Sequence, residues 1–139
     1  MKFSYIFAVI ALACLTLTAS AHRRHFAYTY DWFTPHQGEK EFEVYWTDTE
    51  GHPAQIQLEL EYGITDRWMV APYLVFDNSE GDFDYAGWKV ETKYRLGEQA
   101  FNRILPALYL ELKKGEGEDE VIEGKFITTY LWQNGTVWS

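Results

Sequence analysis

Glutamates and lysines recur at every second position along several segments, and these side chains are the ones best suited to chemistry. Paired carboxylates are the groups that general acid–base catalysis uses. Charged residues at this spacing also form compensating ion pairs, which allow a narrow polar interior to hold them. Catalysis further requires a carboxylate with a perturbed pKa, and alternation alone does not indicate one, so we expect no enzyme and no catalytic residue. The expected interior-facing residues are Glu43, Glu59, Glu61, Lys89, Glu91, Lys93, Arg95, Glu111 and Lys125.

Three histidines, His22, His25 and His36, could bind a metal ion with Asp31 as an additional ligand. Their spacings of 3 and 11 residues match no zinc pattern of paired Cys or His. We therefore interpret them as part of a solvated N-terminal arm.

Two acidic loops carry enough carboxylates for a weak calcium site. Neither loop places its glycine as the twelve-residue calcium loop does, so we expect charged external loops and no metal or cofactor. Divalent cations could bridge such loops to lipopolysaccharide. The carboxylates are Asp77, Glu80, Asp82 and Asp84 in one loop and Glu116, Glu118, Asp119 and Glu120 in the other.

The elements that position these side chains are predicted to be β-strands, because apolar and polar residues alternate with period two and no segment has a helical period. In residues 55–62, Ile56, Leu58 and Leu60 share one face and glutamines and glutamates share the other. Turn-forming residues separate the segments, and Asn134-Gly135 predicts a hairpin before a short last strand. The pattern predicts an all-β, antiparallel up-and-down meander. Its predicted strands are 41–47, 55–62, 67–77, 88–96, 104–113 and 123–133.

The first residues have the features of a cleavable signal peptide. An apolar run at 3–17 follows Lys2, and the small residues Ala19-Ser20-Ala21 follow the run. The run is shorter than the ~20 residues of a membrane-spanning helix. A lipoprotein site at Cys14, the one cysteine of the chain, is an alternative. The expected division is a signal peptide at 1–21, an N-terminal arm at 22–40 and an incomplete antiparallel barrel at 41–139.

Composition excludes two classes of function. The chain has 139 residues, with 12 basic and 21 acidic side chains and a formal net charge of -9. This charge would repel polyphosphate, so we expect no nucleic-acid partner. An aromatic content of 18% is too high for a disordered acidic segment.

Strand length and ring placement favour a sheet that crosses a membrane. Strands of about ten residues fit a tilted crossing of a bilayer. The connections after the first, third and fifth strands are polar and acidic, and those after the second and fourth are expected to be tighter, as in outer-membrane barrels. Alternation alone does not say which face points inward, but rings near strand ends suit a membrane interface. The expected interface aromatics are Trp46, Tyr62, Trp68, Trp88 and Trp132.

The segment Leu58-Glu59-Leu60-Glu61-Tyr62-Gly63-Ile64-Thr65-Asp66-Arg67-Trp68 resembles a motif of uncharacterised bacterial outer-membrane β-barrel proteins, some described as transporter-like or related to the phenol-degradation MetA family. Residues 35–43 and Lys93-Tyr94-Arg95-Leu96 fit the same pattern. The resemblance implies a barrel in the outer membrane of a Gram-negative bacterium and no catalytic residues. Members usually end on a strand with a terminal aromatic residue, whereas this chain stops at Ser139.

We expect a non-enzymatic, porin-like outer-membrane β-barrel for solute passage or envelope structure. The alternative is a periplasmic or secreted soluble β-barrel that binds a small apolar ligand. Six strands and the start of a seventh fall below the eight of the smallest outer-membrane barrels. The expected partners are therefore outer-membrane lipid, a small solute, and either a second copy of the chain or further C-terminal strands.

Overall fold

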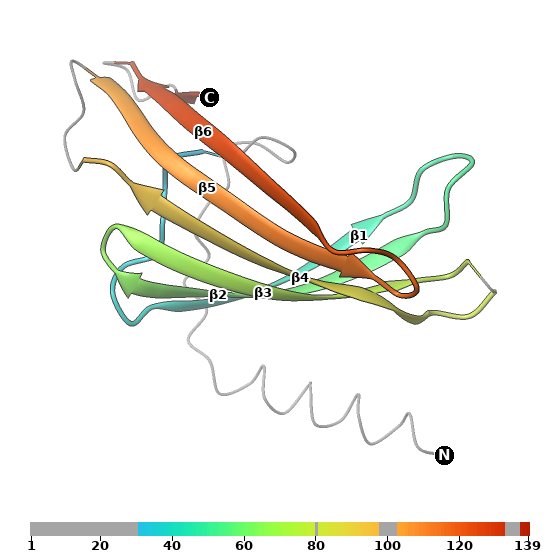
Figure 1. Ribbon diagram of the computed structural model, residues 1–139. Helices are drawn as coiled ribbons and strands as arrows, with labels where there is room; N and C mark the ends of the chain where they lie inside the picture. The colour runs from blue at the N-terminus through green and yellow to red at the C-terminus, as the bar shows by residue number, and fades with distance from the viewer. Residues whose placement is uncertain (1–30, 80, 98–102, 133–136) are drawn as a thin grey trace.

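The computed structural model describes residues 31–79, 81–97, 103–132 and 137–139 (Figure 1). The predicted signal peptide, His22, His25, Glu80 and the hairpin signal at Asn134-Gly135 lie outside these residues. The strands are β1 (Lys40–Thr47), β2 (Gln55–Thr65), β3 (Trp68–Asp77), β4 (Asp84–Arg95), β5 (Ile104–Gly115), β6 (Val121–Leu131) and β7 (Val137–Trp138).

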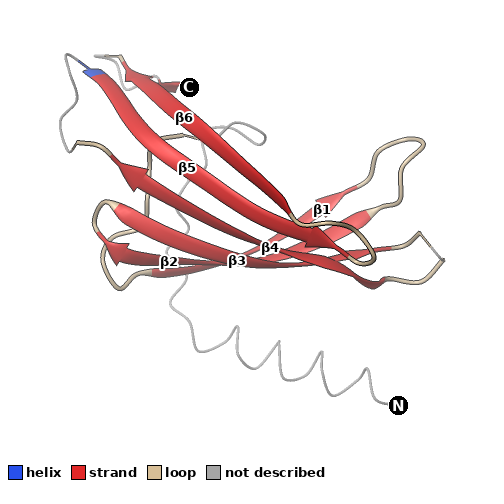
Figure 2. Ribbon diagram, viewed as in Figure 1, coloured by secondary structure: helices blue, strands red, loops and turns tan. Residues whose placement is uncertain are grey.

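These strands form one sheet in chain order, and every neighbouring pair is antiparallel (Figure 2). This confirms the predicted all-β meander. The sheet curves into a trough but does not close into a barrel, because no pairing joins β1 to β6 or β7 among the described strands. One edge of β1 and most of the outer edge of β6 therefore pair with none of the described strands.

The register places the two sequence faces on opposite sides of the trough. Glu43 lies opposite Glu59, and Glu91 opposite Glu111, so charged positions meet across the β1–β2 and β4–β5 pairs. We call the odd-numbered face, from Glu41 in β1 to Thr129 in β6, the concave face. We call the side that carries the even-numbered apolar positions, such as Phe42 and Phe126, the convex face.

Strand bounds differ from the prediction mainly at β4. This strand begins at Asp84, inside the segment predicted to be an acidic loop, because a register shift at Val75/Phe76 lets the pairing with β3 continue. Gly87 makes the irregularity possible: it has φ +156°, and a Cβ there would lie 2.4 Å from the carbonyl oxygen of Lys114.

The connections at the two ends of the sheet differ in composition. The acidic loops between β1 and β2, β3 and β4, and β5 and β6 share one end, which we call the acidic end. The opposite, short-turn end holds the two-residue β2–β3 turn. The β4–β5 connection at this end spans 96–103, so the prediction of a tight turn there was wrong.

No helix among the described residues is long and apolar enough to cross a membrane.

The described part of the N-terminal arm is solvated only in part: residues 36–38, which include His36, are exposed as interpreted from sequence, whereas residues 31–35 are not. Trp32 and Thr34 are buried, and the segment lies against the short-turn end of the sheet. The arm joins β1 through Gly38, whose backbone N–H donates to the carbonyl of Gly63 at 2.8 Å. Gly63 returns a hydrogen bond to the carbonyl of Glu39 at 3.0 Å.

Gly63→Ala is expected to destabilise the protein by about 1–3 kcal/mol, the usual cost of overpacking. A Cβ at this position would lie 2.0 Å from the backbone oxygen of His36, so the arm would have to move. Urea unfolding followed by tryptophan fluorescence measures the effect.

Gly124→Ala in β6 is the matched control, because a Cβ there meets no atom within 4 Å. This variant should be neutral or slightly stabilising. Equal stability of the two variants would contradict the close contact between the arm and Gly63.

Candidate functional site

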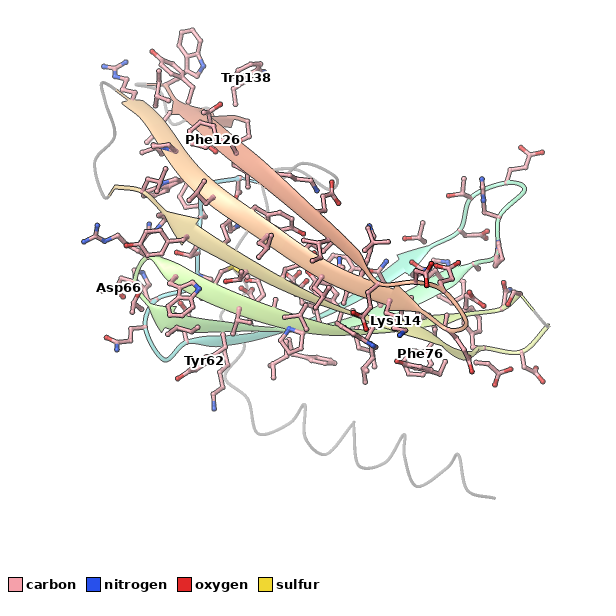
Figure 3. All side chains as sticks on the ribbon, in the orientation of Figure 1. Tyr62, Asp66, Phe76, Lys114, Phe126 and Trp138 are labelled. Atoms are coloured by element: carbon pink, nitrogen blue, oxygen red, sulfur yellow. The ribbon has the colours of Figure 1, made fainter. Side chains whose placement is uncertain are left out.

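Apolar side chains cover the exposed, convex face of the sheet. Ile122 is 71% exposed, Phe126 is 64% exposed and Trp46 is 62% exposed. In Figure 3, Tyr62 and Phe76 point away from the trough. Soluble sheets with one wet face normally place polar residues there, so this distribution is inverted.

Charged side chains occupy the concave face, and some are as buried as a hydrophobic core. Glu59 is 0% exposed, Glu111 is 3% exposed and Glu91 is 4% exposed. The nine charged residues singled out from sequence all lie on this face: Glu43, Glu59, Glu61, Lys89, Glu91, Lys93, Arg95, Glu111 and Lys125.

An ion-pair network stabilises the buried charges in the middle of β4 and β5. The Lys89 ammonium lies 2.6 Å from the carboxylate of Glu91 and 3.9 Å from that of Glu111. Lys113 lies 2.9 Å from Glu111, and the Tyr109 hydroxyl donates to Glu111 at 2.6 Å. Because burying an isolated charge is costly, these partners are what allow the carboxylates to be buried.

Tyrosine rings and lysines share the space between the carboxylates. Lys89 lies 3.8 Å from the centre of the Tyr73 ring, and Lys125 lies 4.8 Å from that of Tyr109. Both distances are within the range of cation–π attraction. The rings therefore fill the interior and also stabilise the positive charges of the two lysines.

A cavity of about 1110 Å³ opens on the concave face toward the acidic end. Seven carboxylates and three lysines line it, so the lining has a negative excess. Lys114, labelled in Figure 3, lies at this end and Asp66 at the opposite one. The carboxylates are Asp77, Asp84, Glu111, Glu116, Glu118, Asp119 and Glu123, and the lysines are Lys89, Lys113 and Lys114.

At the short-turn end, the three segments of the sequence motif meet around Asp66. Its carboxylate accepts a hydrogen bond from the Gln37 backbone N–H at 2.9 Å and lies 3.6 Å from the His36 ring nitrogen. Its backbone carbonyl accepts hydrogen bonds from the Thr34 hydroxyl at 3.3 Å and from the Arg95 guanidinium. Gly63 and Asp66 therefore have a structural role: together they hold the arm and β4 against the β2–β3 turn.

Among the described arm residues, Trp32 is buried in a hydrophobic cluster of the trough. It packs against Leu105, Ala107, Tyr109 and Ile127. Its backbone N–H donates to the Thr129 hydroxyl at 3.0 Å, and the Arg95 guanidinium lies 4.2 Å from its ring centre. Sequence reasoning did not single out Trp32, because an isolated aromatic residue before the first strand follows no period.

The five predicted interface aromatics fall into two groups by height along the strands. Trp46 and Trp88 lie on the acidic-end half of the sheet, and Tyr62, Trp68 and Trp132 at the short-turn end. Trp88 is half-buried and lies inside β4, because that strand begins earlier than predicted. The other four are exposed.

Within the described residues, no group of three or more His, Cys, Asp or Glu side chains could hold a metal ion. His36 and Asp66 are neighbours, but both are exposed and the pair has no third ligand of these types in the described part of the chain. The two acidic loops likewise bring no such group together there.

Comparison of the chain with protein-family models, curated proteins and solved structures found no match.

Glu111→Leu is expected to destabilise the protein by about 1–3 kcal/mol. The change removes the acceptor of the Tyr109 hydroxyl and a carboxylate beside Lys89 and Lys113, which stay in place. Urea unfolding measures the loss. Glu116→Leu, on an exposed loop position, should stay within about 0.5 kcal/mol of the parent. Equal effects would show that Glu111 is not part of a stabilising network.

The lowered pKa of Asp66 predicts that the arm loosens in acid. The Gln37 N–H lowers the pKa of Asp66 below the ordinary 3.8, burial opposes this, and His36 and Arg95 add to the lowering. A carboxylate with a depressed pKa in the folded state stabilises the fold above its unfolded-state pKa. That contribution is lost as the pH falls through the folded-state value.

The Asp66→Asn variant should therefore lose less stability than the parent as the pH falls from above the ordinary aspartate pKa of 3.8 to below the lowered pKa of Asp66 in the folded state. Unfolding midpoints measured across this interval test the difference. Parallel pH profiles for parent and variant would contradict a role of ionised Asp66.

Proposed function

We propose that this protein is a non-enzymatic β-barrel component of an outer membrane, with lipid against the convex face and a polar interior on the concave face. One observation carries the proposal: the apolar face of the sheet is exposed and the charged face is buried. Outer-membrane barrels have this arrangement, with an apolar band outside and polar side chains inside.

The order of side chains along the convex face supports the same function. Aromatic rings gather toward the two ends of the strands, with Trp46 beside Phe83 at the acidic end and Tyr130 beside Trp132 at the other. Aliphatic residues such as Leu108 and Leu110 lie between these heights on β5. Rings at both limits of an aliphatic band suit the two interfaces of a bilayer.

The alternative, a soluble barrel that binds an apolar ligand, has less support. Such a barrel needs an apolar interior and a polar exterior. Here, the cavity is lined by carboxylates and lysines, and large hydrophobic side chains face outward. The negative excess of the lining would favour small cationic solutes over anions, since the local field raises the concentration of the opposite charge.

The edges of β1 and β6 require partners if the sheet lies in a membrane. Lipid offers no hydrogen bonds to the exposed backbone groups of an open edge. We propose that strands of the same alternating pattern cover these edges, from a second copy of the chain or from strands beyond β7. The mass of the assembly extracted from membranes distinguishes these two sources.

Leu110→Arg tests the lipid-facing assignment. Leu110 lies in the middle of β5 and is 50% exposed. Against lipid, arginine near the bilayer midplane costs about 2–4 kcal/mol. Against water, a surface change of this kind usually stays within about 0.5 kcal/mol. Unfolding from phospholipid bilayers in guanidinium chloride measures the difference.

The control is Glu116→Arg, which places the same side chain on an exposed loop. It should leave the stability in bilayers nearly unchanged. A parent protein that stays monomeric and melts cooperatively in plain buffer, together with a Leu110→Arg variant of equal stability, would contradict the membrane assignment.

A further inference from the structure

The short-turn end of the trough is obstructed by the arm, whereas the acidic end is open. In Figure 1 the start of the described chain, in blue, runs across the short-turn end of the sheet. The cavity of about 1110 Å³ lies toward the other end, and none of the described arm residues, Trp32 included, lines it. Trp32 instead occupies the concave face between β5 and β6, among Leu105, Ala107 and Ile127.

The arm has an anchored part and an inserted part. Gln37, Gly38 and Glu39 are tied to the β2–β3 turn, the last two through backbone hydrogen bonds with Gly63. Asp31 and Trp32 are held by side chains of the sheet. The Lys93 ammonium donates to the carbonyl of Asp31 at 3.2 Å and lies 3.8 Å from its carboxylate. The Thr129 hydroxyl accepts from Trp32.

This division allows the inserted part to leave without unfolding β1. Its release would break the contacts made by Lys93, Arg95 and Thr129 and the hydrogen bond of the Thr34 hydroxyl to the Asp66 carbonyl, but keep the backbone bonds to Gly63. The released Arg95 would keep its hydrogen bond to the carbonyl of Asp66. The opening would then lie beside the charged residues of β4, which continue the polar lining toward the cavity.

We propose that residues 31–34 form a plug, centred on Trp32, that closes the polar interior at the short-turn end. With the plug in place the interior is a blind pocket that small cations enter from the acidic end. Passage through the protein requires Trp32 to leave its position. The proposal rests on the membrane function proposed above and adds a closed state to it.

Trp32→Ala tests the plug in protein purified from membranes and reconstituted in planar bilayers. The parent should conduct rarely, and the variant should raise the open probability by roughly a hundredfold or more, the change expected for losing a large buried side chain. Asymmetric KCl gives the ion selectivity. We expect potassium to pass in preference to chloride, because the cavity lining is negative.

Thr129→Ala gives a milder test that does not depend on the folding of the Trp32 variant. It removes the acceptor of the Trp32 N–H and also the hydrogen bond between the Thr129 and Ser139 hydroxyls. Only the first of these holds the arm, so the open probability should rise roughly three- to tenfold, as expected for one hydrogen bond. Thr128→Ala is the matched control on the same strand, because Thr128 is exposed on the opposite face. Protease resistance in the bilayer checks the fold of each variant.

Distinct results separate the failure of the plug from the failure of the membrane function. A parent that inserts and conducts as much as both variants would overturn the plug alone. Inserted variants that stay closed, or an anion-selective current, would also overturn it. A parent that does not insert into bilayers would overturn the membrane function and the plug together.

Discussion

The ion pairing of the concave face is the constraint on which the structure depends. Glu59, Glu91 and Glu111 are almost wholly buried, and a buried carboxylate is stable only beside a compensating group. Lys113 on the same strand and Lys89 on the paired strand β4 provide this compensation for Glu111. A one-residue slip would move these charges to the convex face and bring apolar side chains inward. The ion pairs therefore select one register as well as stabilise it.

The same register explains the exposed apolar surface. When the charged positions of every strand turn inward, the alternating positions must turn outward, and these are mostly aliphatic or aromatic. Water would disfavour a surface of this extent, which supports the proposal that lipid covers it. The open edges of β1 and β6 support the same proposal, in which this sheet forms only part of a larger barrel.

At the short-turn end, residues of the sequence motif hold the arm and so place it in the trough. Gly63 admits the arm because it has no Cβ, and Asp66 receives hydrogen bonds from the arm and from β4. Arg95 contacts both the Asp66 carbonyl and the Trp32 ring. The motif residues thus act as a docking site that directs Trp32 into the trough. Loss of any one contact is expected to loosen the arm before it loosens the strands.

Much of the fold could be predicted from the sequence, because period two is a local property. Alternation along β2 and β5 indicates strands and assigns each residue to one of two faces. It also places Glu59, Glu91 and Lys89 on one face without information on strand pairing. Irregular features were missed for the same reason: the early start of β4 depends on a shift at Val75/Phe76 and on the close approach of Gly87 to Lys114.

The sequence by itself determined the strands, the alternation of polar and apolar residues along them, and the set of charged residues that share a face. Only the tertiary structure decided that this face is the buried one, because alternation is identical whichever face turns inward. It also decided that the arm enters the trough. Trp32 lies 97 positions from Thr129 in the chain, and no local pattern can indicate a contact over that separation. The curvature of the sheet brings the two together at the short-turn end.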